Sequence, residues 1–332
     1  MNDARPALRI SLAIAPGPDS ERLAALAEEL GYARFWLYDS PALYEDVWIT
    51  LGRLAGVTGR LGLGTAVLVP NSRHPMVTAS AIATMERLAP GRCTYAFGTG
   101  ASARWAFDQP ALTWRFMHTY LTQLRALLAG ETVEIEGRPC AMIHHPDLAV
   151  GRPIDVPFVL SAFGPKGMAI ARELDAGIMT MFPPPEGFDE RIQLVAGTVL
   201  DAGETVTDPR VVRAVGPWYV VTHHAVHQGS PEAVDGLPGG VEWRADIEAA
   251  RPAGQRHLAV WEGHVTHLVD RDTTIVEAAG EEVVGMSWVG DADELRSRAT
   301  EAAASGVTEI AYAPVGPDVE REIRAFAAAT IG

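Results

Sequence analysis

The chain has 332 residues, and its 27 basic against 42 acidic residues give a formal charge of −15, which would repel a nucleic-acid backbone. The two cysteines, Cys93 and Cys140, are too few for a disulfide framework, and no apolar run reaches the ~18 residues of a membrane span. The first residues lack the basic and apolar regions of a signal peptide. We therefore expect a cytoplasmic protein without nucleic-acid or membrane partners.

Strand–helix units repeat along the first part of the chain. Apolar strands are predicted at residues 8–15, 33–39, 60–69 and 93–100, and each is followed by a segment of helical periodicity. The first helix has Asp19 or Ser20 as its N-cap and Gly31 as its C-terminal stop. Four such units in succession are typical of a parallel α/β protein.

The pattern is interrupted twice further along. Two short β-prone runs around Glu136-Gly137 predict an inserted hairpin at residues 131–146. Strands five and six follow at 156–163 and 176–182, the sixth completed by an amphipathic segment after Gly187, and residues 210–222 predict a seventh strand. Residues 223–287 are irregular, and we interpret them as an insertion.

The C-terminal part returns to the regular pattern. Asp291 and Glu294 have capping-box spacing at the start of a helix, and a strand at 307–316 and a last helix follow. Eight apolar strands alternating with helices predict a parallel sheet covered by helices. We predict an α/β fold in one domain over residues 1–332, a (β/α)8 TIM barrel with an insertion before the last strand. A doubly wound open sheet is the alternative.

In a parallel barrel, the chemistry is expected at the carboxyl ends of the strands. Polar residues follow several predicted strands, at positions 39–40, 66–72, 99–102, 161–166 and beyond Met181. The turn "FGTGASA" has the spacing of a dinucleotide fingerprint, but it opens the fourth unit and no acidic residue ends the next strand. Its glycines instead suggest a close backbone approach, for example to a flat ligand ring.

A second motif, Gly164-Pro165, begins a helix. Its free N–H groups and the helix dipole point towards the strand ends, where a phosphate would be held, and Lys166 adds charge. A purely structural helix start is the alternative, since proline is common at the first helical position. No G-x-S-x-G or P-loop motif is present, so a serine hydrolase or an NTPase lacks support.

The predicted insertion is rich in histidine and tryptophan. A metal site is one interpretation of its histidines, although no cysteines, H-E-x-x-H motif or clustered carboxylates accompany them; loop or substrate-pocket positions are the other. Its tryptophans, with the loop "ARWAFDQP", predict an apolar pocket roof, and core packing explains them equally well. These residues are His223, His224, His227, His264 and His267, and Trp218, Trp243 and Trp261.

Two longer segments together carry a family resemblance. "RLGLGTAVLVPNSRHPMVTASAIATMERLAPGRCTYAFGTGAS" and "SAFGPKGMAIARELDAGIM" resemble the luciferase-like flavin-dependent oxidoreductases, in the branch near methylenetetrahydromethanopterin reductase. The resemblance covers residues 8–182 and the C-terminal "GDADELRSRATEAAASGVTEIAYAP". It implies a (β/α)8 barrel that binds FMN or the deazaflavin coenzyme F420 at its strand ends.

The resemblance also implies the positions of the cofactor site. Asp39 would lie near the cofactor ring, and Ala66 and Val67 occupy the place where relatives carry a non-prolyl cis peptide behind it. The turn at the ring edge and the segment around the phosphate correspond to Thr99, Gly100, Ala101 and Ser102, and to Ser161, Ala162, Phe163, Gly164, Pro165 and Lys166. Arg73, Lys166 and Arg104 are the candidate cations for a polyanionic cofactor.

The candidate catalytic residues are Asp39, Ser40 and His74. Several deazaflavin-dependent relatives carry a catalytic histidine directly after the strand-two aspartate, whereas this chain has Ser40, whose hydroxyl does not titrate near neutral pH. Either another residue transfers the proton, or the substrate needs no strong base. His74 is a candidate for this role, but the following Pro75 also favours a structural strand-to-helix corner.

We therefore predict an F420-dependent oxidoreductase that transfers a hydride between the deazaflavin and a small organic substrate. An FMN-dependent luciferase-like monooxygenase is the alternative within the same fold. A metal-dependent barrel hydrolase, built on the insertion histidines, is the alternative from another class, and a flavin-binding barrel without turnover also remains open. By resemblance to the family, we expect a homodimer formed through the helix at residues 76–88.

Overall fold

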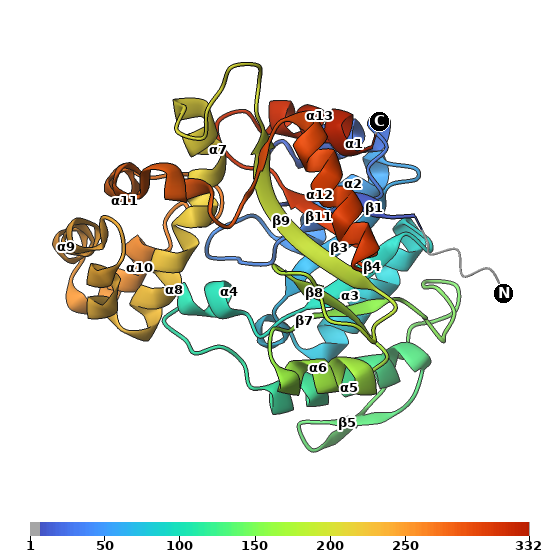
Figure 1. The fold of residues 1–332 in the computed structure, drawn as a ribbon. Coiled ribbons are helices and arrows are strands. Elements are labelled where there is room, and N and C mark those ends of the chain that lie inside the picture. Colours follow the sequence, from blue (N-terminus) through green and yellow to red (C-terminus); the bar gives the residue numbers. More distant parts are fainter. Residues whose placement is uncertain (1–6, 332) are drawn as a thin grey trace.

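The computed structural model describes residues 7–331, and a closed parallel barrel lies at its centre (Figure 1). Each strand pairs in parallel with its neighbours, and β9 closes the ring because it pairs with both β8 and β11. The predicted TIM barrel is confirmed, and the sheet is not open. The barrel strands are β1 (Arg9–Ile14), β2 (Arg34–Leu37), β3 (Gly62–Leu68), β4 (Cys93–Phe97), β7 (Phe158–Ser161), β8 (Gly177–Thr180), β9 (Arg191–Val199) and β11 (Glu309–Ala313).

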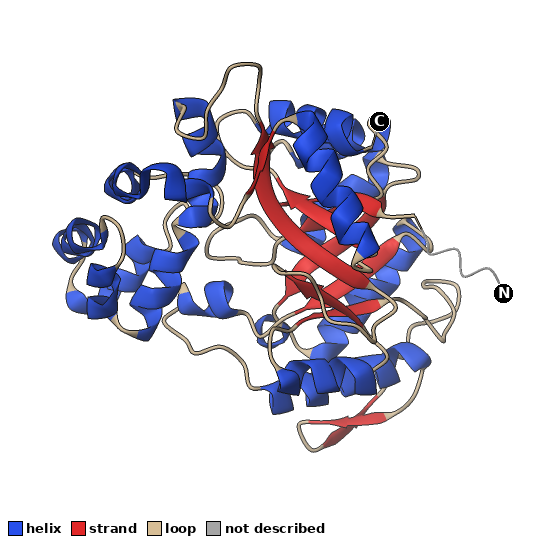
Figure 2. Ribbon diagram, in the orientation of Figure 1, coloured by secondary structure: helices blue, strands red, loops and turns tan. Residues whose placement is uncertain are grey.

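Helices surround the strands, which Figure 2 shows enclosed between them. The helix α5 illustrates why they pack there, because its buried residues Met117, Leu121, Leu124 and Leu128 recur at helical spacing on one face. The strands are buried on both faces, as in β4, where all five residues are buried. The surrounding helices are α1 (Ser20–Glu29), α2 (Val47–Val57), α3 (Pro75–Leu88), α5 (Trp114–Ala129), α6 (Pro165–Glu173), α12 (Ala292–Ala304) and α13 (Val319–Thr330).

The start of α12 has the predicted capping box. The Asp291 carboxylate accepts hydrogen bonds from the backbone N–H groups of Asp293 and Glu294, both at 2.9 Å, and the Glu294 carboxylate accepts one from Asp291 N–H at 2.9 Å. These contacts satisfy donors that a helix start otherwise leaves unpaired.

A two-stranded hairpin lies outside the barrel. Its strands β5 (Val133–Ile135) and β6 (Arg138–Cys140) are antiparallel, and β5 packs beside α5. The two turn residues, Glu136 and Gly137, both have positive φ angles, of 54° and 72°. This backbone conformation is typical of a tight two-residue hairpin turn.

Most of the chain between β9 and β11 is helical and gathers on one side of the barrel, yellow to orange in Figure 1. It has an apolar cluster of its own, which includes Val211, Val215, Trp243, Ile247 and Trp261. The short strand β10 (Trp288–Gly290) then extends the sheet beside β9. The helices are α7 (Pro209–Tyr219), α8 (Val221–Gly229), α9 (Gly240–Ala250), α10 (Arg256–Val260) and α11 (Thr273–Ala279), with the 3-10 segments η2 (Pro231–Gly236), η3 (Ala253–Gln255), η4 (Asp270–Asp272) and η5 (Gly280–Val284).

The prediction of the seventh strand at residues 210–222 is wrong, because these residues form α7 and the start of α8. Pro209 occupies the first turn of α7, and Val211 and Val215, one helical turn apart, are fully buried in the insertion cluster. Packing of these β-branched residues therefore overrides their strand propensity. The seventh strand is β9, which lies in the segment after Gly187 that we predict as amphipathic. The helical region begins with α7, before residue 223.

Within residues 7–331, the structure contains no helix of sufficient length and apolar character to span a membrane.

Candidate active site

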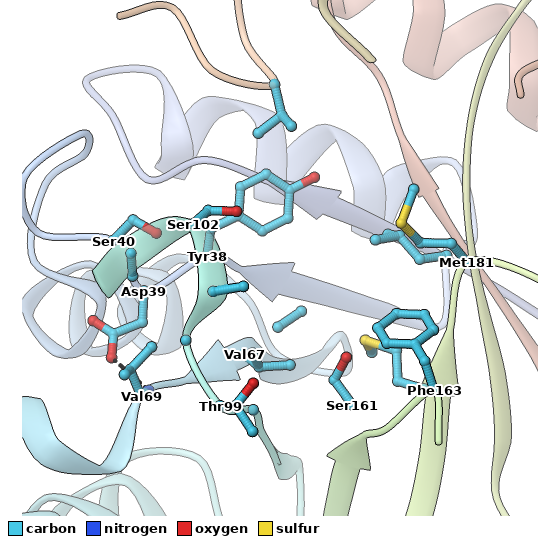
Figure 3. A pocket seen from close by; sticks show the side chains of 18 of the residues that line it. Tyr38, Asp39, Ser40, Val67, Val69, Thr99, Ser102, Ser161, Phe163 and Met181 are labelled. Atoms are coloured by element: carbon cyan, nitrogen blue, oxygen red, sulfur yellow. Dashed lines mark hydrogen bonds between the residues drawn. The ribbon is translucent and has the colours of Figure 1, made fainter. Parts of the chain in front are cut away.

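A cavity of about 440 Å³ opens at the carboxyl ends of the barrel strands. Figure 3 shows side chains pointing into it from the ends of β2, β3, β4, β7 and β8. Among the residues predicted from sequence, those that line it are Asp39, Ser40, Ala66, Val67, Thr99, Gly100, Ala101, Ser102, Ser161, Phe163 and Gly164. His74, Ala162, Pro165 and Lys166 are not among its lining residues.

The floor of the cavity is formed where β3 and β4 end. The Ala66–Val67 peptide bond is cis, as the resemblance implies. At the β4 end, a Cβ atom at Gly98 would lie 2.5 Å from Val67 Cγ2, and one at Gly100 would lie 2.4 Å from Val69 Cγ1. Gly100 also has a φ of 73° and precedes the short helix α4 (Ala101–Trp105). These two glycines therefore allow the backbone after β4 to approach the side chains of Val67 and Val69 closely.

Asp39 ends the second strand unit as a buried carboxylate. It accepts hydrogen bonds from Arg73 Nη1 at 2.7 Å and from Val69 N–H at 3.3 Å, the latter dashed in Figure 3. Burial raises the pKa of Asp39, and the Arg73 guanidinium opposes this shift. Arg73 also donates to Asp46 at 2.9 Å, and Asp46 caps α2. Both Arg73 contacts are to carboxylates, so its charge is already compensated.

His74 lies at the start of α3, immediately after the 3-10 turn η1 (Pro70–Ser72). Its side chain is exposed, and its Nδ1 accepts a hydrogen bond from Met76 N–H at 3.1 Å. Pro75 follows in the first helical position. The structure thus places His74 as a helix cap outside the cavity, whereas Ser40 lies on the cavity wall.

The other two candidate cations, Arg104 and Lys166, are not lining residues but lie one and two positions from lining residues in the sequence. Arg104 donates from Nε to the carbonyl of Pro110. Lys166 is exposed in the first turn of α6, two residues after the cavity residue Gly164, and makes no hydrogen bond or ion pair with the other described residues. It is also the only lysine of the sequence. Among the described residues, Arg104 bonds only a neutral carbonyl and Lys166 bonds nothing, so of the three cations only Arg73 has its charge compensated by carboxylates.

His264 is one of several lining residues that the motifs did not single out as cofactor-site or catalytic residues. Its Nε2 lies 3.0 Å from Ser102 Oγ, and its Nδ1 lies 2.8 Å from Nδ1 of His224. Burial lowers the pKa of His264 to about 3 and that of His224 well below its ordinary value. Because 162 residues separate Ser102 from His264, no local pattern could pair them.

The remaining insertion residues divide between cavity and core. Trp218 lines the cavity, and its buried Nε1 has no hydrogen-bond partner among the described residues. Trp243 and Trp261 are buried in the insertion core, and His223 Nε2 lies 2.9 Å from the Pro238 carbonyl. Across residues 7–331, no three or more His, Cys, Asp or Glu side chains are grouped so that they could hold a metal ion.

Most of the cavity wall is apolar, with Tyr38, Met179, Met181, Leu194 and Val265 among its side chains. Such a wall excludes water and suits a flat ring with a small reactant beside it. A closed parallel barrel with an apolar ligand site at its strand ends defines a TIM-barrel enzyme. The family model described as luciferase-like monooxygenase matches residues 10–309, and the chain belongs to this family. It is therefore an oxidoreductase.

Relatives with similarity along the whole chain point in the same direction. The chain is 29% identical over 326 residues to 5,10-methylenetetrahydromethanopterin reductase of Methanolobus tindarius, with 93% of this chain and 94% of the relative covered. It superimposes with a TM-score of 0.66 on the coenzyme F420 dependent tetrahydromethanopterin reductase of Methanopyrus kandleri, at 19% identity and with 98% of each chain covered.

The same fold also occurs with a different cofactor. The oxygenating constituent of 3,6-diketocamphane monooxygenase from Pseudomonas putida, solved in complex with FMN, has a TM-score of 0.65 at 11% identity, with 98% of this chain and 99% of that chain covered. At these identities the two structural similarities demonstrate a common fold, and the choice of cofactor has to be argued separately.

Proposed function

We propose that this chain is an F420-dependent oxidoreductase that transfers a hydride between the deazaflavin and a small organic substrate. The observation that carries the proposal is the similarity to a methylenetetrahydromethanopterin reductase over more than nine-tenths of both chains. A solved reductase acting on the same class of pterin is described as F420 dependent. The cavity at the strand ends supports the proposal, since its size and apolar walls suit a tricyclic ring.

The residues that would hold the cofactor follow from their positions. The turn from Thr99 to Ser102 and the Ala66–Val67 segment line the floor against which the ring would lie. Lys166 and the first turn of α6 offer a cation and free N–H groups to the phosphate. When bound, the deazaflavin supplies a carbon centre that gives or accepts a hydride, and the protein positions the substrate and excludes water.

The second candidate is an FMN-dependent monooxygenase of the same family. It is favoured by the shared fold with the FMN complex of the diketocamphane enzyme. Both cofactors have a three-ring system and a phosphate, so this cavity does not discriminate between them by shape.

Equilibrium titration of the purified protein with F420 and with FMN, followed by absorbance and fluorescence, tests the proposal. We expect saturable binding of F420 and at least tenfold weaker binding of FMN. Tight FMN binding with no measurable F420 affinity would overturn the proposal and support the monooxygenase instead.

We also propose a homodimer as the oligomeric state. Two adjacent helices, α2 and α3, expose large apolar side chains: Ile49 is 68% exposed, Val57 47% and Val77 54%. An exposed apolar surface across two packed helices is typical of an interaction site.

A further inference from the structure

Another cavity, of about 290 Å³, lies beside the cavity at the strand ends, and we call it the lateral cavity. Met181, Leu194 and Trp218 line both cavities, so these three residues form the wall between them. The rest of the lateral cavity is built by the segment after β8, by β9, by the segment that joins η5 to β10, and by α12. Its walls therefore come from parts of the chain more than a hundred residues apart.

The lateral cavity reaches the outer face of β9. Ile192 and Ala196 belong to an apolar cluster made of residues from several strands, whereas Val195 packs in the cluster shared by the strands and the surrounding helices. Because successive residues of a strand point to opposite faces, Gln193 points to the same outer side as Val195. Gln193 lines the lateral cavity and is not a lining residue of the cavity at the strand ends.

Two buried polar side chains in the lateral cavity have no partner. Gln193 is 6% exposed and Ser287 is 9% exposed, and both are lining residues. Neither the Gln193 amide nor the Ser287 hydroxyl makes a hydrogen bond with another described residue. Buried polar groups without a partner are unfavourable and uncommon in folded proteins. The free amide and hydroxyl therefore indicate that the cavity holds a polar ligand group.

The lateral cavity also has a positive charge. Among its described lining residues, Arg298 is the one with a formal charge. Its Nη1 donates to the Ser287 carbonyl at 3.5 Å, the outer limit of a hydrogen bond, and it forms no ion pair with another described residue. In a chain whose formal charge is −15, a guanidinium without a carboxylate partner beside a free amide favours an anionic ligand.

The remaining wall of the lateral cavity is mostly apolar. Phe182 is 62% exposed and Met286 is 49% exposed, although both are large apolar side chains, and Trp288 lies beside them in the wall. A ligand with an apolar body would cover part of this surface. The cavity volume is near the lower end of the ~300–1,000 Å³ range of ligand pockets, so the ligand should be small.

We propose that the lateral cavity binds a small carboxylic acid with an aromatic or branched apolar body. The carboxylate accepts hydrogen bonds from Arg298, Gln193 and Ser287, and the body packs against Phe182 and Met286. One guanidinium compensates one carboxylate, and its planar fork matches the two carboxylate oxygens. A phosphate dianion would keep one charge uncompensated. The site is separate from the cavity proposed for F420, so this proposal does not rest on the proposed function.

Calorimetric titration of the full chain with phenylacetate, phenylacetamide and inorganic phosphate tests the class of ligand. Phenylacetate and phenylacetamide have the same shape and differ by one charge. We expect saturable binding of phenylacetate with a Kd below about 1 mM, and at least tenfold weaker binding of phenylacetamide and of phosphate. Weaker binding of phenylacetate, or binding of either comparison compound within about tenfold of it, would overturn the proposal.

Methionine methyl NMR locates the bound phenylacetate. Met286 lines the lateral cavity alone, and Met179 lines the cavity at the strand ends alone. The variants Met286→Leu and Met179→Leu assign the two ¹³C-methyl signals. We expect the Met286 signal to shift in proportion to the bound fraction measured by calorimetry, while the Met179 signal stays in place. A Met286 signal that does not move, or a Met179 signal that moves as far, would overturn the assignment.

Variants test the residues that hold the carboxylate. We expect Arg298→Gln to weaken phenylacetate binding at least tenfold and Gln193→Met, which keeps an unbranched side chain, at least threefold. The control is Arg296→Gln, an exposed position on the same helix that pairs with Asp293 and does not line the cavity. It should bind phenylacetate within about twofold of the wild type. A loss in Arg298→Gln no larger than in this control would overturn the proposal.

These measurements need neither F420 nor turnover. Failure of the chain to bind F420 would contradict the proposed function and leave the phenylacetate result standing. The comparison of phenylacetate with phenylacetamide uses the wild-type protein, so it decides on the site even where a variant fails to fold.

Discussion

The two buried imidazoles, His224 and His264, should make the stability of the protein depend on pH. Their pKa values are lowered in the folded protein, to about 3 for His264, because burial disfavours the cation. Unfolding restores values near about 6.5, so between these limits the unfolded chain binds more protons. The stabilisation is complete above about pH 6.5 and is lost as the pH falls towards about 3.

We expect the free energy of unfolding to fall between about pH 6.5 and about pH 5, with about 1.4 kcal/mol per pH unit for each histidine that takes up a proton. Urea unfolding at several pH values measures this slope. His264→Gln should reduce the slope, whereas His145→Gln, at an exposed position, should not. An unchanged slope in His264→Gln would contradict the prediction.

Asp39 and Arg73 form a second buried polar group that we expect to be structurally critical. The Asp39 side chain is 1% exposed and depends on Arg73 for its compensating charge. Arg73→Met should therefore destabilise the fold by about 3 kcal/mol, since it leaves a buried carboxylate unpaired. The double variant Arg73→Met/Asp39→Asn should recover part of this loss in denaturant unfolding. Arg87→Met, at an exposed site on α3, is the control and should cost less than about 0.5 kcal/mol.

We expect the environment of the Lys166 side chain to change when the phosphate of the cofactor binds. Because it is the only lysine, reductive methylation with ¹³C-formaldehyde labels one side chain besides the N-terminus. We expect its NMR signal to shift on F420 addition, and Lys166→Gln to weaken F420 binding roughly tenfold, as for a lost charge contact of about 1.4 kcal/mol. A signal that stays unchanged at saturating F420 would place the phosphate elsewhere.

The side chain of His74 caps the start of helix α3, which gives this histidine a structural role. His74 accepts from Met76 N–H and lies outside the cavity. We expect His74→Ala to lower stability by about 0.5–1 kcal/mol and to leave F420 affinity and turnover unchanged. His74→Asn, which retains a side-chain acceptor, should restore the stability. Loss of turnover in His74→Ala with intact folding and F420 binding would instead return His74 to the proton-transfer role.

The elements α7 and β9 illustrate where local patterns fail. From its residues alone, the segment that forms helix α7 is predicted to be a strand. The segment that forms strand β9 is predicted to be amphipathic and to follow the sixth strand. β9 is a strand because it lies between β8 and β11 and closes the barrel, and α7 is a helix because Val211 and Val215 pack into the insertion cluster. Which neighbour buries an apolar segment is decided by distant parts of the chain, so periodicity alone is insufficient.

The protein should be a dimer in solution if the exposed apolar side chains of α2 and α3 form an interface. We expect light scattering at micromolar concentration to give the mass of a dimer. The variant Ile49→Lys/Val77→Lys should be monomeric, because it puts charges in the proposed interface. Val241→Lys, at an exposed apolar position on α9 in the insertion, is the control and should remain dimeric. A monomeric wild type would refute the proposal.

The barrel and the position of its binding site could be predicted from the amino-acid sequence alone. Apolar runs, glycine and proline stops and the Asp291 cap are local signals, and the carboxyl ends of parallel strands necessarily meet at one end of the barrel. Asp39, Ser40 and the turn from Thr99 to Ser102 could therefore be placed at the cavity in advance. The contacts that determine the chemistry of these residues could not be predicted from sequence, because they join distant segments of the chain. Arg73 compensates Asp39, and His264 reaches Ser102 across 162 residues, only after the barrel closes and the insertion packs over its end.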